Sequence, residues 1–462
     1  MNAREVQAFL VLATALVGAP AEGAEDPSAP ASPPNAADVY RRAFAAMPEL
    51  TKEEESLLQG RASTADAVAL SDKLAPALEL YRTAARMPAC DWGVNLEKQT
   101  MTFQGLLPHL VPLNTLAGAA AWEGERARSA DPSAFVAWHE DALRSAAHAG
   151  QGWPLVSGLI ESAIRLRSMD ALSTNLAALP PGLVADLRAR LDAIPPCVEF
   201  HQAMQAEKSF GIDWFIRRLV EVQRNQQSAE AATNFAANLR MSAMVEGGPA
   251  GLAIGLEEAD GGSFWVALGQ RRRGIELVSA DLQHGRAILL KNGQAALVFL
   301  QERRVEPIHL NLMTNELTRL LGDRDARTVL DGVGTNSTRL VEQLMEASDI
   351  LDAAAARTAT PVTDPEAWGK AIAGDVTNRN VIAAMYFPFA GAARACIDAA
   401  GARERMLRVA LDVMRNGPGA ATRSRDPWGK GGFTYRETTN GFELVSKLTR
   451  DGKPVVMSVP RR

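Results

Sequence analysis

The stretch from Leu239 to Glu302 constrains the fold most, because short apolar runs separated by turn residues replace the helical pattern found on either side. Each run has the length of a β-strand, and the Asn292–Gly293 pair is the clearest hairpin signal because both residues tolerate positive φ. We therefore predict a small sandwich or partly open barrel of roughly six short strands. The runs are Arg240–Val245, Gly251–Leu256, Ser263–Leu268, Gly274–Val278, Arg286–Leu290 and Ala295–Leu300.

A helical pattern precedes and follows this β-module. Leu74, Leu78 and Tyr81 have the spacing of one helix face. Asp131–Pro132 is typical of a helix start, because Asp accepts hydrogen bonds from free amides and Pro needs no donor there. Short breaks such as Gln151–Pro154 then predict antiparallel helical hairpins.

The predicted fold class is α+β: an irregular antiparallel helical-hairpin array with an inserted small β-sandwich and a short β-tail. At 462 residues the chain exceeds one ordinary core, so several packed units are expected. The predicted order is a signal peptide at 1–24, a flexible linker at 25–37, a helical-hairpin domain at 38–238, the β-module at 239–302, a second helical segment at 303–416 and the β-tail at 417–462.

The first 24 residues have the composition of an export signal. Arg4 and the amino terminus supply positive charge, and the apolar run Ala8–Val17 is too short to span a bilayer comfortably. An uncleaved anchor or a plain N-terminal helix is the alternative. We expect a protein of the periplasm or cell envelope with no stable membrane span after cleavage.

Cysteine usage and net charge limit the classes of protein to which the chain can belong. Export would place Cys90, Cys197 and Cys396 in an oxidising compartment, where three thiols form at most one disulfide. Two alternatives remain: a disulfide between Cys90 and Cys197, or three buried thiols that are all unpaired. The net charge of −5 gives no electrostatic basis for binding nucleic acid. The one dense basic run, Arg271–Arg273, is predicted to be a solvated hairpin tip beside Gly274.

Three parts of the chain resemble known families, the first two of which precede the C-terminal tail. Cys90–Leu96 and Leu107–Leu110 resemble an uncharacterised family of exported, mostly helical bacterial proteins, and this resemblance implies no activity. The middle module is similar to the periplasmic homology region of the type II secretion clamp protein, on Met244–Gly248, Gly274–Ser279 and Ala287–Gln294. In that family the module docks on an outer-membrane secretin, so the resemblance implies an envelope secretin as partner. A membrane anchor normally precedes that region, whereas a helical domain precedes it here, which puts direct docking in doubt.

The C-terminal tail is similar to the end of a major pseudopilin. The residues that carry this resemblance are Asp426–Gly429, Phe433, Tyr435, Gly441–Phe442 and Asp451–Lys453. The sequence does not open with a pilin leader and its hydrophobic helix, so we do not expect the chain itself to be a pseudopilin. The tail can hold calcium in that family, but here we favour a structural turn over an ion site.

The best catalytic candidates are Cys197 and His201, with Glu199 between them. On a helix, residues four apart share a face, so the pair would form a thiolate–imidazole couple or part of a metal site. Because Pro195–Pro196 comes just before, Cys197 is predicted to start a helix, where the helix dipole lowers a thiol pKa. A packed thiol and a surface imidazole are the plainer interpretation. A phosphate loop and a Gly-X-Ser-X-Gly motif are absent from the sequence.

We therefore predict an exported, envelope-located protein-binding or scaffolding protein, accessory to a type II secretion or pilus-like system. It has a protein partner and needs no nucleic acid, cofactor or metal. An exported hydrolase or metal-dependent enzyme that uses Cys197 and His201 is the alternative. The predicted partner-binding residues are those of two strands at the edge of the β-module, where a partner strand would pair: Ile275, Leu277, Val278 and Val298.

Overall fold

The chain is an α+β protein whose packing divides it into two compact units. Unit 1 comprises Met1–Glu207, Ala354–Ile372 and Pro388–Arg462, and unit 2 comprises Lys208–Ala353 and Ala373–Phe387. The predicted signal peptide and nearly all of the predicted linker lie outside the described residues. The computed structural model describes residues 34–51, 53–54, 58, 64–93, 108–151, 154–213, 216–217, 235–236, 238–246, 251–300, 305–307, 323–333, 337–377, 379–387 and 389–461.

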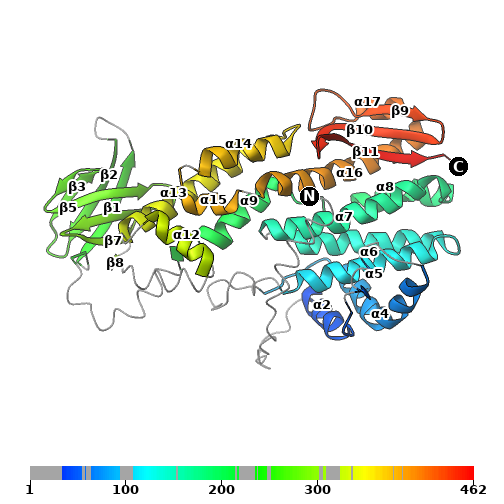
Figure 1. Ribbon diagram of the computed structural model, residues 1–462, viewed down its shortest axis with the longest axis horizontal. Helices are drawn as coiled ribbons and strands as arrows, with labels where there is room; N and C mark the ends of the chain where they lie inside the picture. Colours follow the sequence, from blue (N-terminus) through cyan, green and yellow to red (C-terminus); the bar gives the residue numbers. More distant parts are fainter. Residues whose placement is uncertain are drawn as a thin grey trace. The chain divides into compact units, whose positions relative to one another are not determined.

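The first part of unit 1 is an array of helices, as predicted, and from residue 110 to residue 208 the breaks between them are short (Figure 1). Asp131 starts one of them by accepting from the amides of Ser133 and Ala134, both at 3.0 Å, with Pro132 at the first helical position. The next helix begins after Pro154. The helices are α2 (Ala36–Ala45), α4 (Thr64–Ala85), α5 (Leu110–Ala127), α6 (Pro132–Gly150), α7 (Leu155–Asn175), α8 (Pro181–Asp192) and α9 (Phe200–Lys208).

The C-terminal part of the chain completes unit 1. The long helix α16 (Ala390–Asn416) packs against α7 and α8 and also against the C-terminal sheet. The predicted β-tail is therefore a sheet that shares its core with the helices: Leu444 and Met457 are buried together with Leu172 and Met406. After α17 (Gly419–Arg423), the sheet has the antiparallel order β11-β10-β9, from β9 (Thr434–Thr438), β10 (Gly441–Arg450) and β11 (Lys453–Pro460).

The packing differs from the predicted division into consecutive domains. We expected residues 303–416 to form one helical segment, but α16 belongs to unit 1 and the helices before it contribute to both units. The apolar face of α16 is covered by helices more than 200 positions earlier, a pairing that periodicity does not specify. These further helices are α12 (Asp323–Val333), α13 (Ser337–Thr358), α14 (Pro365–Thr377) and α15 (Val381–Tyr386).

The β-module of unit 2 consists of two antiparallel sheets around one core, in which Ile254 and Leu256 of the first sheet pack with Leu277 and Leu289 of the second. The sheets have the orders β1-β2-β3 and β4-β5-β6-β7-β8. The strands are β1 (Leu239–Glu246), β2 (Leu252–Glu258), β3 (Ser263–Ala267), β4 (Arg271–Arg272), β5 (Ile275–Asp281), β6 (Arg286–Lys291), β7 (Gln294–Phe299) and β8 (Val305–Pro307), so the module reaches beyond the predicted boundary at residue 302.

The turn chemistry of the module follows the sequence. Asn292 and Gly293 both have positive φ, 51° and 81°, and Lys291 pairs with Gln294 across the hairpin. Arg273 and Gly274 form a second turn of the same kind, and the three arginines of residues 271–273 are exposed at its tip, which confirms the solvated hairpin. Across the described ranges, no helix combines the length and the apolar character that crossing a bilayer requires.

Glu207, at the end of α9, caps the start of α7. Its carboxylate accepts a hydrogen bond from the amide of Leu155 at 2.9 Å, and this amide is one of those that a helix leaves without an internal partner. Burial raises the pKa of the Glu207 carboxyl to about 7, and the bond from Leu155 offsets this only in part. The capping residue is therefore partly protonated at neutral pH.

The raised pKa of Glu207 predicts that the free energy of unfolding falls as the pH rises. The folded protein binds a proton at Glu207 more tightly than the unfolded chain does. The stability that this protonation contributes is therefore fully present below about pH 4.5 and is lost as the pH rises through about 7. Glu207→Gln keeps an acceptor for Leu155 without charge. We expect its free energy of unfolding to match that of the wild type near pH 4.5 and to exceed it by about 1–3 kcal/mol at pH 8. Urea unfolding at the two pH values measures this, with the exposed Glu79→Gln as control; a variant less stable at pH 8 would contradict it.

Candidate functional site

Unit 1 contains a cavity of about 1020 Å³ beside the loop that joins α8 to α9. One wall is a face of α16, and the others come from the end of α6, from Glu161 of α7, from the residues just before and within the start of α9, from residues 358–361 and from the turn that precedes β9. Charged side chains are concentrated on these walls. The charged and aromatic lining residues are Glu161, Glu199, Phe200, His201, Arg394, Asp398, Glu404, Arg405, Arg408, Arg425 and Trp428.

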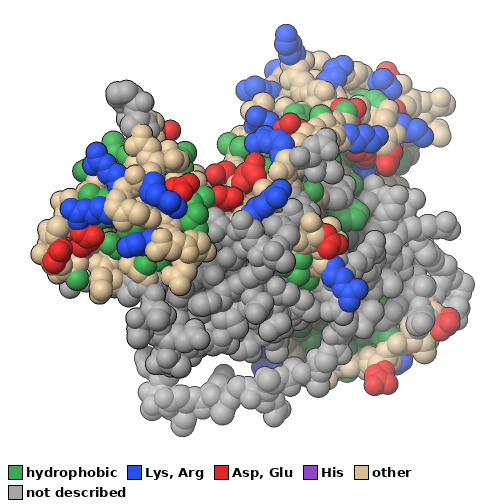
Figure 2. All heavy atoms as spheres, turned by 60° about the vertical axis from the view of Figure 1, so that its left-hand side comes forward, with side chains coloured by type: hydrophobic (Ala, Val, Ile, Leu, Met, Phe, Trp, Pro, Cys, Tyr) green, Lys and Arg blue, Asp and Glu red, His purple; other side chains and the backbone are tan. Residues whose placement is uncertain are grey.

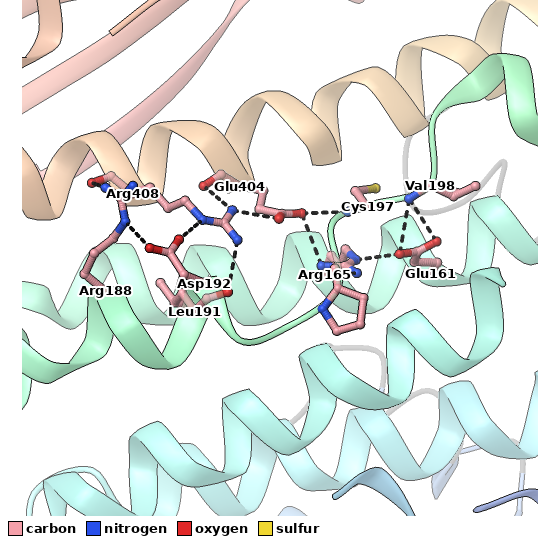
Figure 3. Close-up of polar contacts among 10 residues, drawn as sticks. Glu161, Arg165, Arg188, Leu191, Asp192, Cys197, Val198, Glu404 and Arg408 are labelled. Atoms are coloured by element: carbon pink, nitrogen blue, oxygen red, sulfur yellow. Dashed lines mark hydrogen bonds and ion pairs between the residues drawn. The ribbon is translucent and has the colours of Figure 1, made fainter. Parts of the chain in front are cut away.

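A buried guanidinium, that of Arg165, lies behind two carboxylates that line the cavity, Glu161 and Glu404 (Figure 3). The side chain of Arg165 is 1% exposed; its Nε donates to Glu161 at 2.7 Å and its Nη1 donates to Glu404 at 3.1 Å. Its remaining nitrogen donates to the carbonyl of Pro195 at 2.7 Å. One guanidinium therefore joins α7, α16 and the loop between α8 and α9. Removing one partner of such a buried pair costs about 3–5 kcal/mol, because it leaves an uncompensated charge.

The two carboxylates also hold the loop backbone. Glu404 accepts from the amide of Cys197 at 3.0 Å, and Glu161 accepts from the amide of Val198 at 3.3 Å. Glu161 fits because residue 150 is glycine: a Cβ there would overlap its carboxylate. Each of the two carboxylates therefore accepts from the Arg165 guanidinium and from one backbone amide of the loop.

From Glu404 the ion pairs extend along α16 to residues that are exposed to solvent. Arg408 donates to Glu404 at 2.7 Å and to Asp192 at 2.8 Å, and Asp192 also accepts from Arg188 at 2.9 Å. Asp192 and Arg188 are well exposed, and surface pairs of this kind contribute about 0–1 kcal/mol. Most of what this network contributes to stability therefore comes from its buried end, around Arg165.

Two carboxyls of the cavity have raised pKa values. Burial raises the pKa of Glu161 to about 7, although the Arg165 guanidinium opposes the shift. Burial also raises the pKa of Asp398 to about 6, opposed by Arg394 and by a hydrogen bond from Trp428. Carboxyls with such values in a cavity are candidates for functional groups, although ion-pair networks produce similar shifts.

Cys197 and His201 line this cavity, but the structure does not pair them as predicted. Helix α9 begins at Phe200, so Cys197 lies in the preceding loop and not at a helix start. His201 instead contacts Glu199, with 3.2 Å between Nδ1 and the carboxylate. Burial, together with the nearby Glu161 carboxylate, raises the pKa of the Cys197 thiol well above its usual value. The expected lowering of that pKa by a helix dipole is wrong, because no helix begins there.

The other histidines that the structure describes in unit 1 have packing roles. His148 is buried against Tyr40, whose hydroxyl lies 3.1 Å from its Nδ1, and His139 is fully buried beside Phe135. Burial lowers the pKa of both imidazoles to about 4. No group of three or more His, Cys, Asp or Glu residues suited to hold a metal ion occurs among the described residues.

The C-terminal turn is held by Asp426, which is fully buried. Its carboxylate accepts from the amides of Trp428 and Lys447 and from the hydroxyl of Ser446, at 2.7–3.1 Å. Asp451, the other carboxylate of the tail resemblance, lies in an exposed hairpin turn. The prediction of a structural turn at Asp426 is confirmed by these bonds.

The structure corrects the predicted position of the partner-binding residues. Ile275, Leu277 and Val298 are 1%, 0% and 0% exposed and belong to the core of the β-module, and Val278 is half-buried. Strand β5 pairs with β4 and β6, and β7 pairs with β6 and β8, so these residues are not at a free edge. For Val298 the missing neighbour is β8, which lies beyond the expected module boundary.

The first sheet has an apolar outer face that the sequence analysis did not identify. In one row across the strands, Ala243, Gly255 and Trp265 are neighbours. In the next row, Val245, Ala253 and Ala267 are neighbours. We call these six residues the outer face.

Exposed apolar side chains are concentrated in the β-module. Of the six large ones with high exposure among the described residues, four belong to it: Val245, Trp265, Leu268 and Leu282. Hydrophobic side chains reach the surface of the module among Lys and Arg side chains (Figure 2). Val245 and Trp265, at 49% and 47% exposed, both belong to the outer face.

A second polar cluster, in unit 2, was also missed, because its members are far apart in the sequence. The ammonium of Lys208 lies 2.9 Å from His284 Nε2 and 2.7 Å from Asp352, while Asp281 lies 2.7 Å from His284 Nδ1. Arg286 donates to the same Asp281 carboxylate at 2.8 Å. These bonds join α9, α13 and the turn after β5.

No family model, curated protein or solved structure matches the chain. The resemblances to exported helical proteins, to the secretion clamp protein and to pseudopilins therefore stay predictions. The two candidate sites, the charged cavity of unit 1 and the outer face of the β-module, are therefore argued from their geometry alone.

The three cysteines, all of which the structure describes, are unpaired, and we predict that none reacts quickly. Burial raises the thiol pKa of Cys90, Cys197 and Cys396, to about 12 in the case of Cys90, so the thiolate fraction at pH 8 is small. In the native protein we expect labelling by a disulfide reagent to be at least about tenfold slower than for a free thiol. In denaturant all three should react at the free-thiol rate. Fast native labelling that Cys197→Ser abolishes would contradict this and restore the thiol-enzyme alternative.

Proposed function

We propose that the protein is an exported, envelope-located protein-binding or scaffolding protein, and that the β-module docks its partner through the outer face. The exposed Trp265 on this face is the observation that carries the proposal. Tryptophan residues account for an unusually large share of binding energy at protein interfaces, where they lie in well-packed pockets that exclude water.

The neighbours of Trp265 favour such an approach. An added Cβ at Gly255 would lie 3.4 Å from the indole, so the ring lies close over a position without a side chain. The remaining outer-face residues are three alanines and Val245. Ala267 is buried, so Trp265 and Val245 supply most of the accessible apolar surface, with small residues between them. Apolar surface of this kind on a soluble module is typical of an interaction site.

The partner expected from the sequence is an envelope secretin. This part of the proposal depends on the resemblance of the module to the secretion clamp protein, and export depends on the composition of residues 1–24. The hydrolase alternative is not carried forward, because Cys197 and His201 do not pair and the pKa of the thiol is raised.

The docking proposal is tested by replacing the two exposed outer-face side chains. We expect Trp265→Ser with Val245→Ser to lower secretin recovery in a pull-down from native membranes by about thirtyfold, since truncating a central Trp typically costs about 2 kcal/mol or more. Leu282→Ser is the matched control, because Leu282 is 45% exposed in the same module but outside the outer face.

The outcomes separate the two parts of the proposal. Both variants should retain the unfolding midpoint of the wild type, because the replaced side chains are exposed. Recovery that is equal in the double variant and in Leu282→Ser would refute docking through the outer face. A wild-type protein that recovers no secretin would remove the secretion system from the proposal.

A further inference from the structure

The cavity of unit 1 has more cationic groups than its own carboxylates engage. Arg405 and Arg425 both line it and are exposed, and neither forms an ion pair with a carboxylate of the described residues. The carboxylates of the walls already have basic partners: Glu161 with Arg165, Glu199 with the imidazole of His201, Asp398 with Arg394 and Glu404 with Arg408. Four arginines and four carboxylates line the cavity, and Arg165 adds a guanidinium behind Glu161 and Glu404. The guanidiniums of Arg405 and Arg425 are therefore the charged groups of the lining that keep no ion-pair partner among the described residues.

Arg394 supplies a donor that has no partner inside the protein. Its side chain is 1% exposed; its Nε donates to Asp398 at 3.3 Å, and its Nη2 donates to the carbonyls of Thr358 and Thr360 at 3.1 and 2.6 Å. Its Nη1 is buried and makes no hydrogen bond. Buried polar groups are almost always paired, so an unpaired donor in a cavity wall indicates a position for an acceptor.

The guanidinium of Arg394 is also held in a fixed orientation. It lies over the ring of Trp368, 4.5 Å from the centroid, and 5.7 Å from that of Phe200. An arginine fixed by stacking and by two carbonyls loses little further freedom when it binds an anion, and its planar fork suits carboxylate and phosphate oxygens. The donor is thus already positioned for binding.

An apolar surface accompanies these cations. Trp428, 7% exposed, lines the cavity beneath Arg405, whose guanidinium lies 5.4 Å from the ring centroid. Ile397 lines it from the same face of α16 as Arg394. Small-molecule sites commonly combine a mainly apolar wall with a few placed polar groups.

We propose that this cavity binds a small organic anion. Its carboxylate or phosphate oxygens accept from Nη1 of Arg394 and from Arg405 and Arg425, and its apolar body lies against Trp428 and Ile397. This ligand site belongs to unit 1 and does not depend on docking through the β-module.

The acidic groups of the cavity are compatible with such a ligand. Glu161 and Glu404 are turned to Arg165 and to the backbone of the loop (Figure 3). Glu161 is in addition partly protonated at neutral pH, because burial raises its pKa to about 7. The repulsion that four carboxylates would exert on an anion is therefore reduced.

The site is tested with three oxyanion probes on the full chain, namely phenyl phosphate, benzoate and inorganic phosphate, by titration calorimetry at low salt. We expect at least one aromatic probe to bind with a Kd below about 1 mM, more tightly than inorganic phosphate, and neutral benzyl alcohol not to bind. Arg394→Met should abolish binding, but it also removes bonds to two carbonyls and can unfold the unit.

A second variant keeps the test decisive. Arg405→Gln with Arg425→Gln changes only exposed side chains and should weaken binding of the aromatic probe by about tenfold or more. Arg415→Gln is the matched control, because Arg415 is exposed on α16 but does not line the cavity, and it should change the Kd by less than about twofold. Absence of binding by all three probes at about 10 mM would overturn the proposal. Unchanged affinity in the double variant would overturn it equally.

Discussion

The structure of unit 1 depends on the buried contact of Arg165 with Glu161 and Glu404. Arg165 and Glu404 are 239 positions apart, and their contact joins α7 to α16 across the loop that precedes α9. Taking three charges out of water is costly, and the cost is offset only because each carboxylate also accepts a backbone hydrogen bond. The geometry that satisfies these charges also fixes the inner wall of the cavity.

The same contact explains why two arginines of the cavity keep no carboxylate partner among the described residues. Glu161 and Glu404 are engaged by Arg165, Arg408 and the loop amides, so they do not pair with Arg405 and Arg425. One helix, α16, therefore has two roles: its buried carboxylate stabilises the fold, and its arginines line a space that suits an anion. The outer face of the β-module is a separate candidate site with different chemistry, in which an exposed indole and small side chains replace charge.

Local signals in the sequence predicted local structure well. Asp131–Pro132 starts α6, Asn292–Gly293 forms a hairpin turn and the arginines of residues 271–273 form an exposed tip, because each depends on residues a few positions apart. The α+β class and the β-tail followed from the same periodicities. The buried ion pair was missed because a sequence does not show that residues 165 and 404 meet.

Two site predictions failed for identifiable reasons. Ile275, Leu277 and Val298 have the alternation of a covered strand face, which is the buried face and not the edge. Cys197 was placed at a helix start because two prolines precede it, but α9 begins three residues later. A signal for the cavity does exist in α16, where Arg394, Asp398, Gly401, Glu404, Arg405 and Arg408 recur at three- and four-residue spacing in an alanine-rich helix.

Native-state hydrogen exchange of the Cys197 and Val198 amides tests the role of Arg165 most directly. Both residues lie in a loop, where amides usually exchange through small local openings, yet here they donate to buried carboxylates held by Arg165. We expect them to exchange as slowly as the central amides of α7 and α16, by opening of the whole unit. Exchange at the rate of ordinary loop amides, while α7 and α16 stay protected, would contradict the account.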